Sequence, residues 1–353
     1  MAIQPETLVT QTENFNLKND VFLDLNAQPQ RLREELAKQA NGSLVIIDEI
    51  QRIPELLNEI HYLIEAKKHH FVLTGSSARK LRRTGVNLLG GRATEVIFHP
   101  LNYAEIGDAF FDLPKILNYG TLPSIFLSKA PNQDLRDYVG LYLREEIHAE
   151  GLVRKLPSFS RFLEVAALSN SQMINYTGIA RDAQIAPSVC YEYFQILNDT
   201  LIAHELPPWQ GSRKRKAIAT GKFYFFDCGV SRALQKRSEF GRNDPLYGEA
   251  LETYIFHELR TYTDYQKLAP LLYWRSTSQF EVDFILDEST AIEVKATKNP
   301  GPGDFKGLAA LKEEKKFKRY LLVCNAPRSR VVAGIEVYPI QKFLEELWRG
   351  QIK

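Results

Sequence analysis

Apolar residues in the first hundred positions form short runs that are separated by polar segments. Such runs cover residues 43–47, 70–77 and 95–99, and between the first two the apolar positions of 54–67 recur at helical spacing. Unbroken apolar runs indicate strands buried on both faces, and their alternation with helices is typical of a parallel sheet with right-handed crossovers. We therefore expect an α/β fold at the start of the chain.

The first of these runs ends in two carboxylates, Asp48 and Glu49. Open α/β sheets place their ligands at the carboxyl ends of the strands, so both acids are expected at a ligand-binding edge. Acids at this position can hold Mg²⁺ and polarise an attacking water. The alternative is a buried strand followed by a solvated acidic turn.

The middle of the chain has the pattern of short helices followed by strands. Helical spacing covers 160–168, 174–182 and 188–200, and the strand-like run 201–206 follows. Two short helices joined by a tight turn and followed by strands predict a winged helix-turn-helix.

The next loop carries four consecutive cations close to Trp209. They are Arg213, Lys214, Arg215 and Lys216. We consider them candidates for contact with the phosphate backbone of DNA. Two alternatives stay open: a solvated loop, and a winged helix that only packs domains together.

The last third of the chain has the order helix, three strands, helix, strand. A helix over 247–263 contains Glu252, and strand-like runs follow at 271–275, 280–286 and 291–296. The turn at 287–290 predicts that the last two runs form a hairpin. Glu293 and Lys295 are two residues apart and share one face of a strand, and Asp283 can reach that face from the neighbouring strand. A further helix at 303–316 and a strand at 319–325 complete the order.

These side chains have the chemistry of a phosphodiesterase centre. Phosphodiester hydrolysis needs a hard cation held by carboxylate oxygens and a group that positions water. Asp283, Glu293 and Glu252 are the candidate Mg²⁺ ligands, and Lys295 is the candidate group for orienting water. The alternative for Glu293 and Lys295 is an ordinary surface ion pair.

Composition adds little that is specific. Lys and Arg number 45 against 43 Asp and Glu, so a basic surface has to be local. The three cysteines are far apart, which argues against a zinc site or a disulfide framework and favours reduced thiols in the cytoplasm. No apolar run is long enough for a membrane span, and no export signal is expected.

Six short motifs, in this order, identify a resemblance that covers nearly the whole chain. Residues 73–77, 89–92, 100–106, 118–123, 223–229 and 281–284 read LTGSS, LGGR, PLNYAEI, NYGTLP, FYFFDCG and EVDF. The chain resembles AAA-type P-loop ATPases that carry a C-terminal domain of unknown function. The resemblance implies that Asp48 and Glu49 are the Walker B acids, that Thr74 is a polar sensor and that Arg92 is an arginine finger. The alternatives are turn and helix-capping chemistry for Thr74 and an ordinary surface arginine for Arg92. The C-terminal third resembles the PD-(D/E)xK nuclease fold.

The chain departs from the family at its beginning. A phosphate-binding loop needs glycines and a lysine around the phosphates, whereas Pro5 and Glu6 stand at the corresponding positions here. Proline removes an N–H donor and glutamate repels phosphate. ATP, the family's ligand, is therefore not expected to bind. The missing first strand leaves an exposed sheet edge, which predicts self-association or a protein partner.

These expectations describe a multidomain α/β chain. Its parts are a truncated P-loop-type parallel sheet (1–106), a helical lid (107–157), a winged-helix connector (158–222) and a restriction-endonuclease-like α/β domain (223–353). The expected function is that of an ATPase-family protein associated with nucleic acid, with nucleotide binding lost and a metal-dependent nuclease-like centre. Two hypotheses compete with it: a non-catalytic DNA- or protein-interaction module with both acidic centres as remnants, and a full ATPase whose true start lies upstream.

Overall fold

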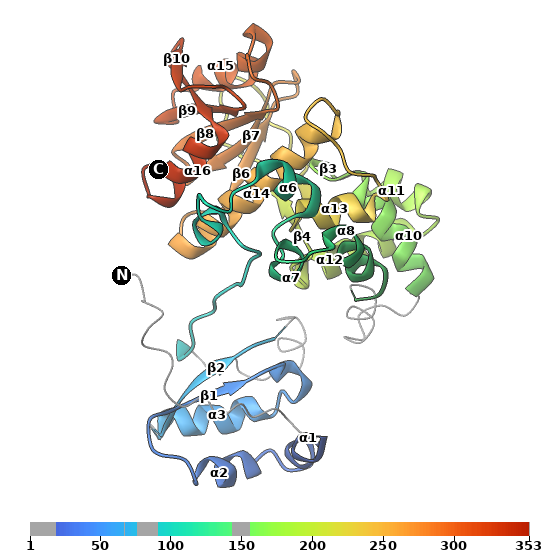
Figure 1. Cartoon of the computed structure of the whole chain (residues 1–353), viewed down its shortest axis with the longest axis vertical. Helices are drawn as coiled ribbons and strands as arrows, with labels where there is room; N and C mark the ends of the chain where they lie inside the picture. The colour runs from blue at the N-terminus through green and yellow to red at the C-terminus, as the bar shows by residue number, and fades with distance from the viewer. Residues whose placement is uncertain (1–18, 67, 76–90, 143–155, 353) are drawn as a thin grey trace. The chain divides into compact units, whose positions relative to one another are not determined.

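The computed structural model describes residues 19–66, 68–75, 91–142 and 156–352 of the chain (Figure 1). The chain divides into two compact units, residues 1–95 and residues 96–353. Each unit has its own hydrophobic core. None of the helices in the described ranges is long and apolar enough to cross a membrane.

The first unit is a strand–helix–strand motif preceded by two short helices. Its elements are α1 (Asn19–Ala27), α2 (Arg31–Leu36), β1 (Ser43–Ile47), η2 (Ile50–Arg52), α3 (Leu56–Glu65) and β2 (His69–Leu73). The two strands are parallel and in register from Ser43 opposite His69 to Ile47 opposite Leu73. Parallel strands need such a crossover connection, as the alternating pattern predicts.

One face of this two-stranded sheet stays exposed in the described part of the unit. Val45 is buried in the core that the helices form, whereas the paired residues Ile46 and Val72 are 39% and 45% exposed. Successive side chains of a strand point to opposite faces, so helices on one side cover only alternate residues. The prediction that both faces are buried is wrong for these strands. The run 95–99 is not a strand either, because it pairs with neither β1 nor β2.

The second unit begins with short helices and a small sheet. The helices are α5 (Tyr103–Ile106), α6 (Leu113–Tyr119), α7 (Pro123–Phe126), α8 (Pro131–Asp137), η4 (Tyr138–Tyr142) and α10 (Leu156–Ala167). The elements of the small sheet and its helices are β3 (Gln172–Met173), α11 (Tyr176–Asp182), α12 (Pro187–Asp199), β4 (Ala203–Leu206) and β5 (Lys222–Phe225). The antiparallel strands have the order β3-β5-β4, so β5 is the central strand. Asn175 caps α11 by accepting from the amide of Gly178 at 3.0 Å.

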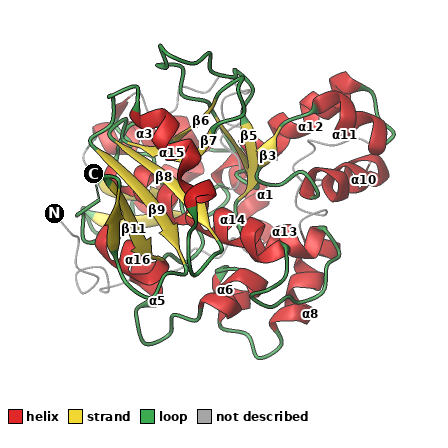
Figure 2. Ribbon diagram, turned by 90° about the horizontal axis from the view of Figure 1, so that it is seen from above, coloured by secondary structure: helices red, strands yellow, loops and turns green. Residues whose placement is uncertain are grey.

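The rest of the second unit is a larger mixed sheet between helices. Its elements are α13 (Cys228–Leu234), α14 (Leu246–Gln266), β6 (Leu272–Arg275), β7 (Glu281–Leu286), β8 (Thr290–Lys295), η5 (Pro302–Phe305), α15 (Lys306–Lys312), β9 (Arg319–Cys324), β10 (Arg330–Val332), β11 (Ile335–Pro339) and α16 (Ile340–Trp348). The strand order is β10-β11-β9-β8-β7-β6. The strands lie between α15 on one face and α14 and α16 on the other (Figure 2). Alternate residues fill two cores, with Phe284 and Ile292 on the α14 side and Ile285 and Ala291 on the α15 side.

The compact units do not coincide with the expected domain boundaries. Within residues 96–106, which the sequence analysis assigns to the ATPase core, the amide of Tyr103 donates to Glu258 of α14 at 2.8 Å. Helix α6 belongs to the expected lid, yet it packs against α13 and α14. The apolar faces of these short helices are buried by the C-terminal elements, which is why they belong to the second unit.

Candidate functional site

Three of the predicted site residues of the first unit lie together at the carboxyl ends of β1 and β2. The hydroxyl of Thr74 donates to the carboxylate of Asp48 and accepts from the amide of Glu49 at 3.3 Å. Glu49 has a left-handed backbone with φ of 55°, and its carboxylate accepts from the side-chain amide of Gln51. Asp48 and Thr74 are exposed and Glu49 is half-buried. This first acidic centre is thus an open group of polar side chains.

Arg92 is not brought to this group. It forms an ion pair with Glu65 at the last residue of α3. Because α3 carries the chain back to the start of β2, Glu65 lies at the opposite end of the strands from Asp48. Pro5 and Glu6 lie outside the described residues.

The second acidic centre is organised around a residue that the sequence analysis missed. Lys222, the first residue of β5, places its ammonium 3.0 Å from Glu252 Oε1, 2.5 Å from Glu281 Oε1 and 3.5 Å from Asp283 Oδ1. Its side chain is only 4% exposed. The hydroxyl of Tyr224 also donates to Glu252, at 2.6 Å. A lysine at the start of an apolar run is the only signal of this role in the sequence.

A bulge in β7 interrupts the regular alternation of side chains between the two faces of the sheet at Asp283. Leu272 pairs with Ile285, but Trp274 pairs with Val282, so β7 has one more residue than β6 over this stretch. Val282 and Ile285 therefore both face the α15 core. Asp283 instead contacts Lys222 with one oxygen and accepts from the amide of Val294 with the other, at 2.9 Å. The simple alternation on which the predicted cluster relies breaks at this position.

The two other predicted residues of the centre, Glu293 and Lys295, form an ion pair close enough to Asp283 for its charge to act on both. Lys295 Nζ lies 2.5 Å from Glu293 Oε1 on β8. The second oxygen, Glu293 Oε2, is buried and has no hydrogen-bond partner among the described residues. The side chain of Glu293 is 7% exposed and that of Lys295 is 35% exposed. This is the ion pair of the alternative interpretation, but its acid is buried.

Burial and neighbouring charges shift the pKa values of these groups. Burial raises the pKa of Glu252 to about 7 against the opposing effect of Lys222. Burial, with Asp283 nearby, raises the pKa of Glu293 well above its usual value. Burial alone would lower the pKa of Lys222, yet Glu252, Asp283 and Glu281 raise it well above its usual value. The lysine is therefore a permanent cation in this centre.

The carboxylates of this centre do not fit a metal ion in the described structure. No group of three or more His, Cys, Asp or Glu residues in the described ranges is arranged to hold one. Glu252, Glu281 and Asp283 converge on an ammonium, and a divalent cation at the same point would be repelled by it. Among the described residues of this centre, Glu293 Oε2 is a buried carboxylate oxygen without a hydrogen-bond partner, and a single ligand of this kind does not make a Mg²⁺ site.

The basic run 213–216 is docked onto the C-terminal part of the second unit. Glu314 is buried and accepts from the hydroxyl of Ser212 at 2.7 Å and from the amides of Arg213 and Lys214 at 2.9 and 3.0 Å. Arg215 donates to the carbonyl of Ala310 at 3.0 Å. The backbone of this loop is therefore fixed by side-chain acceptors.

The same loop covers the free edge of the larger sheet. The amide of Trp209 donates to the carbonyl of Tyr273 at 2.6 Å, and the amide of Ile218 donates to the carbonyl of Arg275 at 2.8 Å. Short bridges pair Pro208 with Tyr273 and Ala217 with Ser276. Edge strands need such a cover, because their unpaired backbone groups otherwise pair with other chains.

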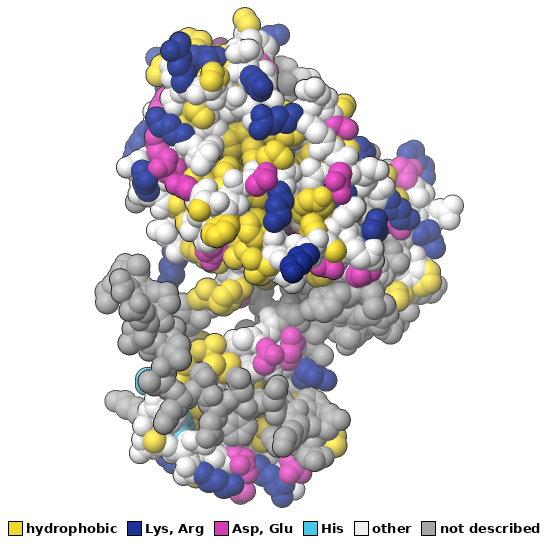
Figure 3. All heavy atoms as spheres, viewed as in Figure 1, with side chains coloured by type: hydrophobic (Ala, Val, Ile, Leu, Met, Phe, Trp, Pro, Cys, Tyr) yellow, Lys and Arg dark blue, Asp and Glu magenta, His cyan; other side chains and the backbone are white. Residues whose placement is uncertain are grey.

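Docking brings two groups of cations together. Arg213, Lys214 and Lys216 are exposed on the loop, and Lys315, Lys316 and Lys318 are exposed on the segment that follows Glu314. We call these six residues the basic surface. Figure 3 shows several lysine and arginine side chains at this end of the unit, over α15 and β10. Arg215 is excluded from the basic surface because it pairs with Glu313 at 3.1 Å.

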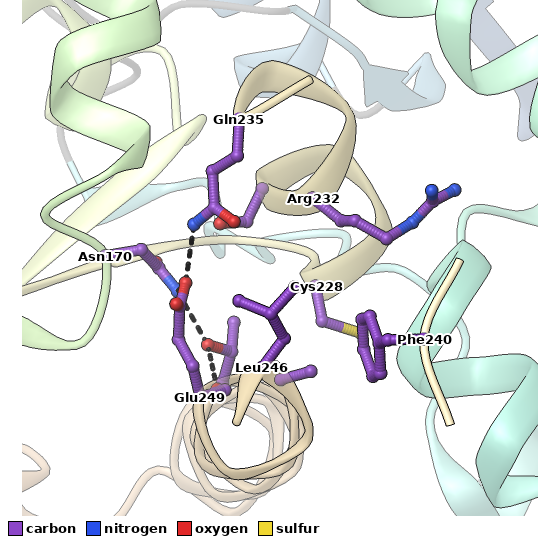
Figure 4. Close-up of a pocket in the computed structure, with 10 residues that line it drawn as sticks. Asn170, Cys228, Arg232, Gln235, Phe240, Leu246 and Glu249 are labelled. Carbon is purple, nitrogen blue, oxygen red and sulfur yellow. Dashed lines mark hydrogen bonds between the residues drawn. The ribbon is translucent and has the colours of Figure 1, made fainter. Parts of the chain in front are cut away.

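A small cavity between α13 and α14 offers no further ligand site. Its volume of about 10 Å³ is no more than a single water molecule needs. Asn170 and Gln235 point toward Glu249 and donate to it at 3.2 and 2.6 Å (Figure 4). Asn170 also donates to Thr253 at 2.8 Å. Asn170, just before β3, and Gln235, just after α13, are thus tied to α14, whereas the hydroxyl of Ser231 in the same cavity is buried without a hydrogen-bond partner among the described residues.

Comparisons with known families match three consecutive segments of the chain. Residues 4–107 match a family described as an AAA domain, residues 111–241 match a domain of unknown function (DUF8612), and residues 247–343 match a second one (DUF4143). The AAA-domain match is consistent with a protein of the ATPase class. The two other matches fall on domains without an assigned function.

The similar curated proteins are described as uncharacterized. One protein from Mycobacterium tuberculosis and one from Mycobacterium bovis are each 26% identical over 300 residues, which is 81% of this chain and 65% of theirs. A protein from Haemophilus influenzae is 22% identical over 341 residues, covering 89% of this chain and 80% of its own. The chain thus spans about 65% of the length of the mycobacterial relatives. No solved structure matches the chain.

Proposed function

We propose that this chain is a non-catalytic nucleic-acid-binding protein of the AAA-type ATPase class. It binds the phosphate backbone through the basic surface, and its second acidic centre stabilises the fold without cleaving the bound strand. The observation that carries the proposal is the docking of the loop by Glu314. This contact adds the cations of the loop to those of residues 315–318.

The order of elements supports a winged-helix assignment for the middle of the chain. Helix α10 is followed by β3, then by α11 and α12, and then by β4 and β5. In a winged helix the loop between the last two strands is the wing, and here it holds the basic run. The exposed residues of α12 include Tyr191 and Glu192 but no lysine or arginine. Contact through the wing therefore favours phosphate binding over the reading of base edges.

The order of elements also supports a nuclease-like assignment for the C-terminal part. One helix, three strands, a second helix and a further strand follow one another from α14 to β9. A fold does not establish an activity, however. Since Lys222 occupies the point where the carboxylates converge, we assign no hydrolytic step to this domain.

Fluorescence anisotropy with labelled DNA tests the proposal. We expect salt-dependent binding to duplex and single-stranded DNA, with little preference for sequence. Replacing Arg213, Lys214 and Lys216 by alanine removes three candidate phosphate contacts, so the slope of log Kd against log salt should fall by about three.

The matched control removes three exposed cations elsewhere: Arg242, Lys267 and Lys342. This triple alanine variant should bind as the wild type does. Equal losses in both variants would show that only overall charge matters, and the absence of any salt-dependent binding would contradict the proposal.

A further inference from the structure

The second acidic centre already contains a cation that belongs to the protein. We propose that Lys222 is the permanent internal cation of this centre and occupies the position of a divalent metal. Replacing it by a neutral side chain would open a binding site for a divalent cation. The inference concerns the centre alone and does not depend on nucleic-acid binding.

The ammonium of Lys222 has three carboxylate neighbours: it hydrogen-bonds to Glu252 and Asp283 and forms an ion pair with Glu281. An ammonium has three N–H donors, and Lys222 Nζ has three carboxylate oxygens within 3.5 Å, one each from Glu252, Glu281 and Asp283. Glu252 comes from α14 and the two other acids from β7. A single cation therefore holds together two elements that lie apart in the sequence.

The second oxygens of two of these acids are already bound by the protein. Glu281 Oε2 accepts from Arg275 at 2.9 Å, and Asp283 Oδ2 accepts from the amide of Val294 at 2.9 Å. These contacts fix the carboxylates so that one oxygen of each points at Lys222. With Lys222 among them, these residues are not arranged to hold a metal ion, so the fixed oxygens would become available to a hard divalent cation only after the ammonium is removed.

The backbone holds Lys222 in place. Lys222 pairs with Leu206 on one side and with Met173 on the other, because β5 is the central strand of the small sheet. Its ammonium also lies 5.7 Å from the centre of the Tyr273 ring. The backbone of Lys222 is therefore fixed in the sheet, its buried ammonium is held by the three carboxylates, and a metal cannot share the position with it.

Melting of the full chain with and without Mn²⁺ tests the inference. The variants are Lys222→Met, which keeps the apolar stem without the charge, and Lys222→Met combined with Asp283→Asn. We expect that Mn²⁺ does not raise the melting temperature of the wild type. At a Mn²⁺ concentration far above the Kd, it should raise the melting temperature of Lys222→Met by about 5 °C. The double variant should lose this rise.

Lys295→Met is the matched control, because it removes the other lysine of the centre and leaves Lys222 in place. Mn²⁺ should not raise the melting temperature of this variant through a site that contains Asp283. If Lys222→Met does not fold, Lys222→Gln replaces it, since its amide can donate to one of the carboxylates.

Two outcomes overturn the inference. One is a folded Lys222 variant that Mn²⁺ does not stabilise. The other is a wild-type protein that binds Mn²⁺, measured by electron paramagnetic resonance, in a way that Asp283→Asn abolishes. The wild-type measurement needs no Lys222 variant, so it can overturn the inference even if those variants fail to fold.

Discussion

The two acidic centres differ in burial and in the groups that face them. The carboxylate of Asp48 is exposed at the end of β1 and contacts the hydroxyl of Thr74. Asp283, in contrast, is 5% exposed and contacts the ammonium of Lys222. Both centres follow from similar sequence patterns of apolar residues and acids. The comparison shows that apolar runs in the sequence mark the strand that Asp48 follows and the strand that contains Asp283 but do not reveal which group balances the charge of each acid.

The difference has an energetic consequence. An exposed acid is solvated by water, so its neighbours contribute little to stability. A buried acid has lost that solvation, and removal of its partner leaves an uncompensated charge in the interior. The two centres should therefore respond very differently to substitution.

The largest effect is expected for Lys222→Ala. It leaves Glu252, Glu281 and Asp283 without their shared cation and should lower the free energy of unfolding of the second unit by about 3–5 kcal/mol. Urea denaturation followed by intrinsic fluorescence measures it. Lys236→Ala is the control, since Lys236 pairs with Glu164 at 2.8 Å but is 68% exposed. A similar loss in both variants would remove the distinction between buried and exposed pairs.

The second-largest effect is a dependence of stability on pH. It is expected from Glu258, a buried acid whose hydrogen-bond donors are uncharged. Glu258 is fully buried and accepts from the amide of Tyr103 and from Trp348 Nε1 at 2.6 Å. Burial raises its pKa from 4.5 to about 7. The folded state therefore binds the proton of Glu258 more tightly than the unfolded state does. The stability that this proton contributes is fully present below pH 4.5 and is lost as the pH rises through 7.

Between these limits Glu258 should reduce the free energy of unfolding by roughly 3 kcal/mol as the pH rises. Glu258→Gln carries no titratable proton, so its stability should vary less with pH. Melting temperatures measured across this pH range decide the point. Identical pH profiles for wild type and variant would show that Glu258 does not titrate in this range.

Glu314→Ala should have an intermediate effect on stability and a clear effect on DNA binding. It leaves the amides of Arg213 and Lys214 without their acceptor and should cost about 1–3 kcal/mol. The loop cations should then be held less firmly, so DNA affinity should fall although an acid has been removed. Glu313→Ala, at the neighbouring position, removes the same charge and the half-exposed ion pair with Arg215, but leaves the loop amides bound to Glu314. If both variants bind DNA more tightly than the wild type, charge and not docking governs the basic surface.

The smallest effect is expected for Asp48→Asn. The side chain is exposed and its partner Thr74 is exposed as well, so the free energy of unfolding should change by no more than about 0.5 kcal/mol. Chemical denaturation of the full chain measures the change. A loss comparable to that of Lys222→Ala would mean that the first centre is as strongly coupled to its fold as the second.

The sequence was sufficient to place the elements that carry the acids. Asp48 and Thr74 follow parallel strands, and parallel strands end at the same edge, so their proximity could be predicted. The hairpin of β7 and β8 is also confirmed, with the turn at 287–290 joining the two strands as predicted. By contrast, the run 95–99 was predicted as a strand because it is apolar, although apolar character alone does not provide a pairing partner.

The counter-charges could not be predicted. Lys222 is 30 residues from Glu252 and 61 from Asp283 along the chain, and nothing in its local sequence distinguishes it from an exposed lysine. The docking of Arg213 by Glu314 spans 101 residues. Contacts of this kind are set by the packing of helices and sheets against one another, and a local pattern carries no information about them.

The most direct test of the account is to incubate the wild-type chain with a labelled DNA duplex in the presence of Mn²⁺ and to follow binding and cleavage in the same sample. A native gel reports the complex and a denaturing gel reports the integrity of the strands. We predict a complex that dissolves as salt is raised, as phosphate contacts do, and strands that remain intact. Cleavage that is abolished by Asp283→Asn, or the absence of any complex at low salt, would contradict the account.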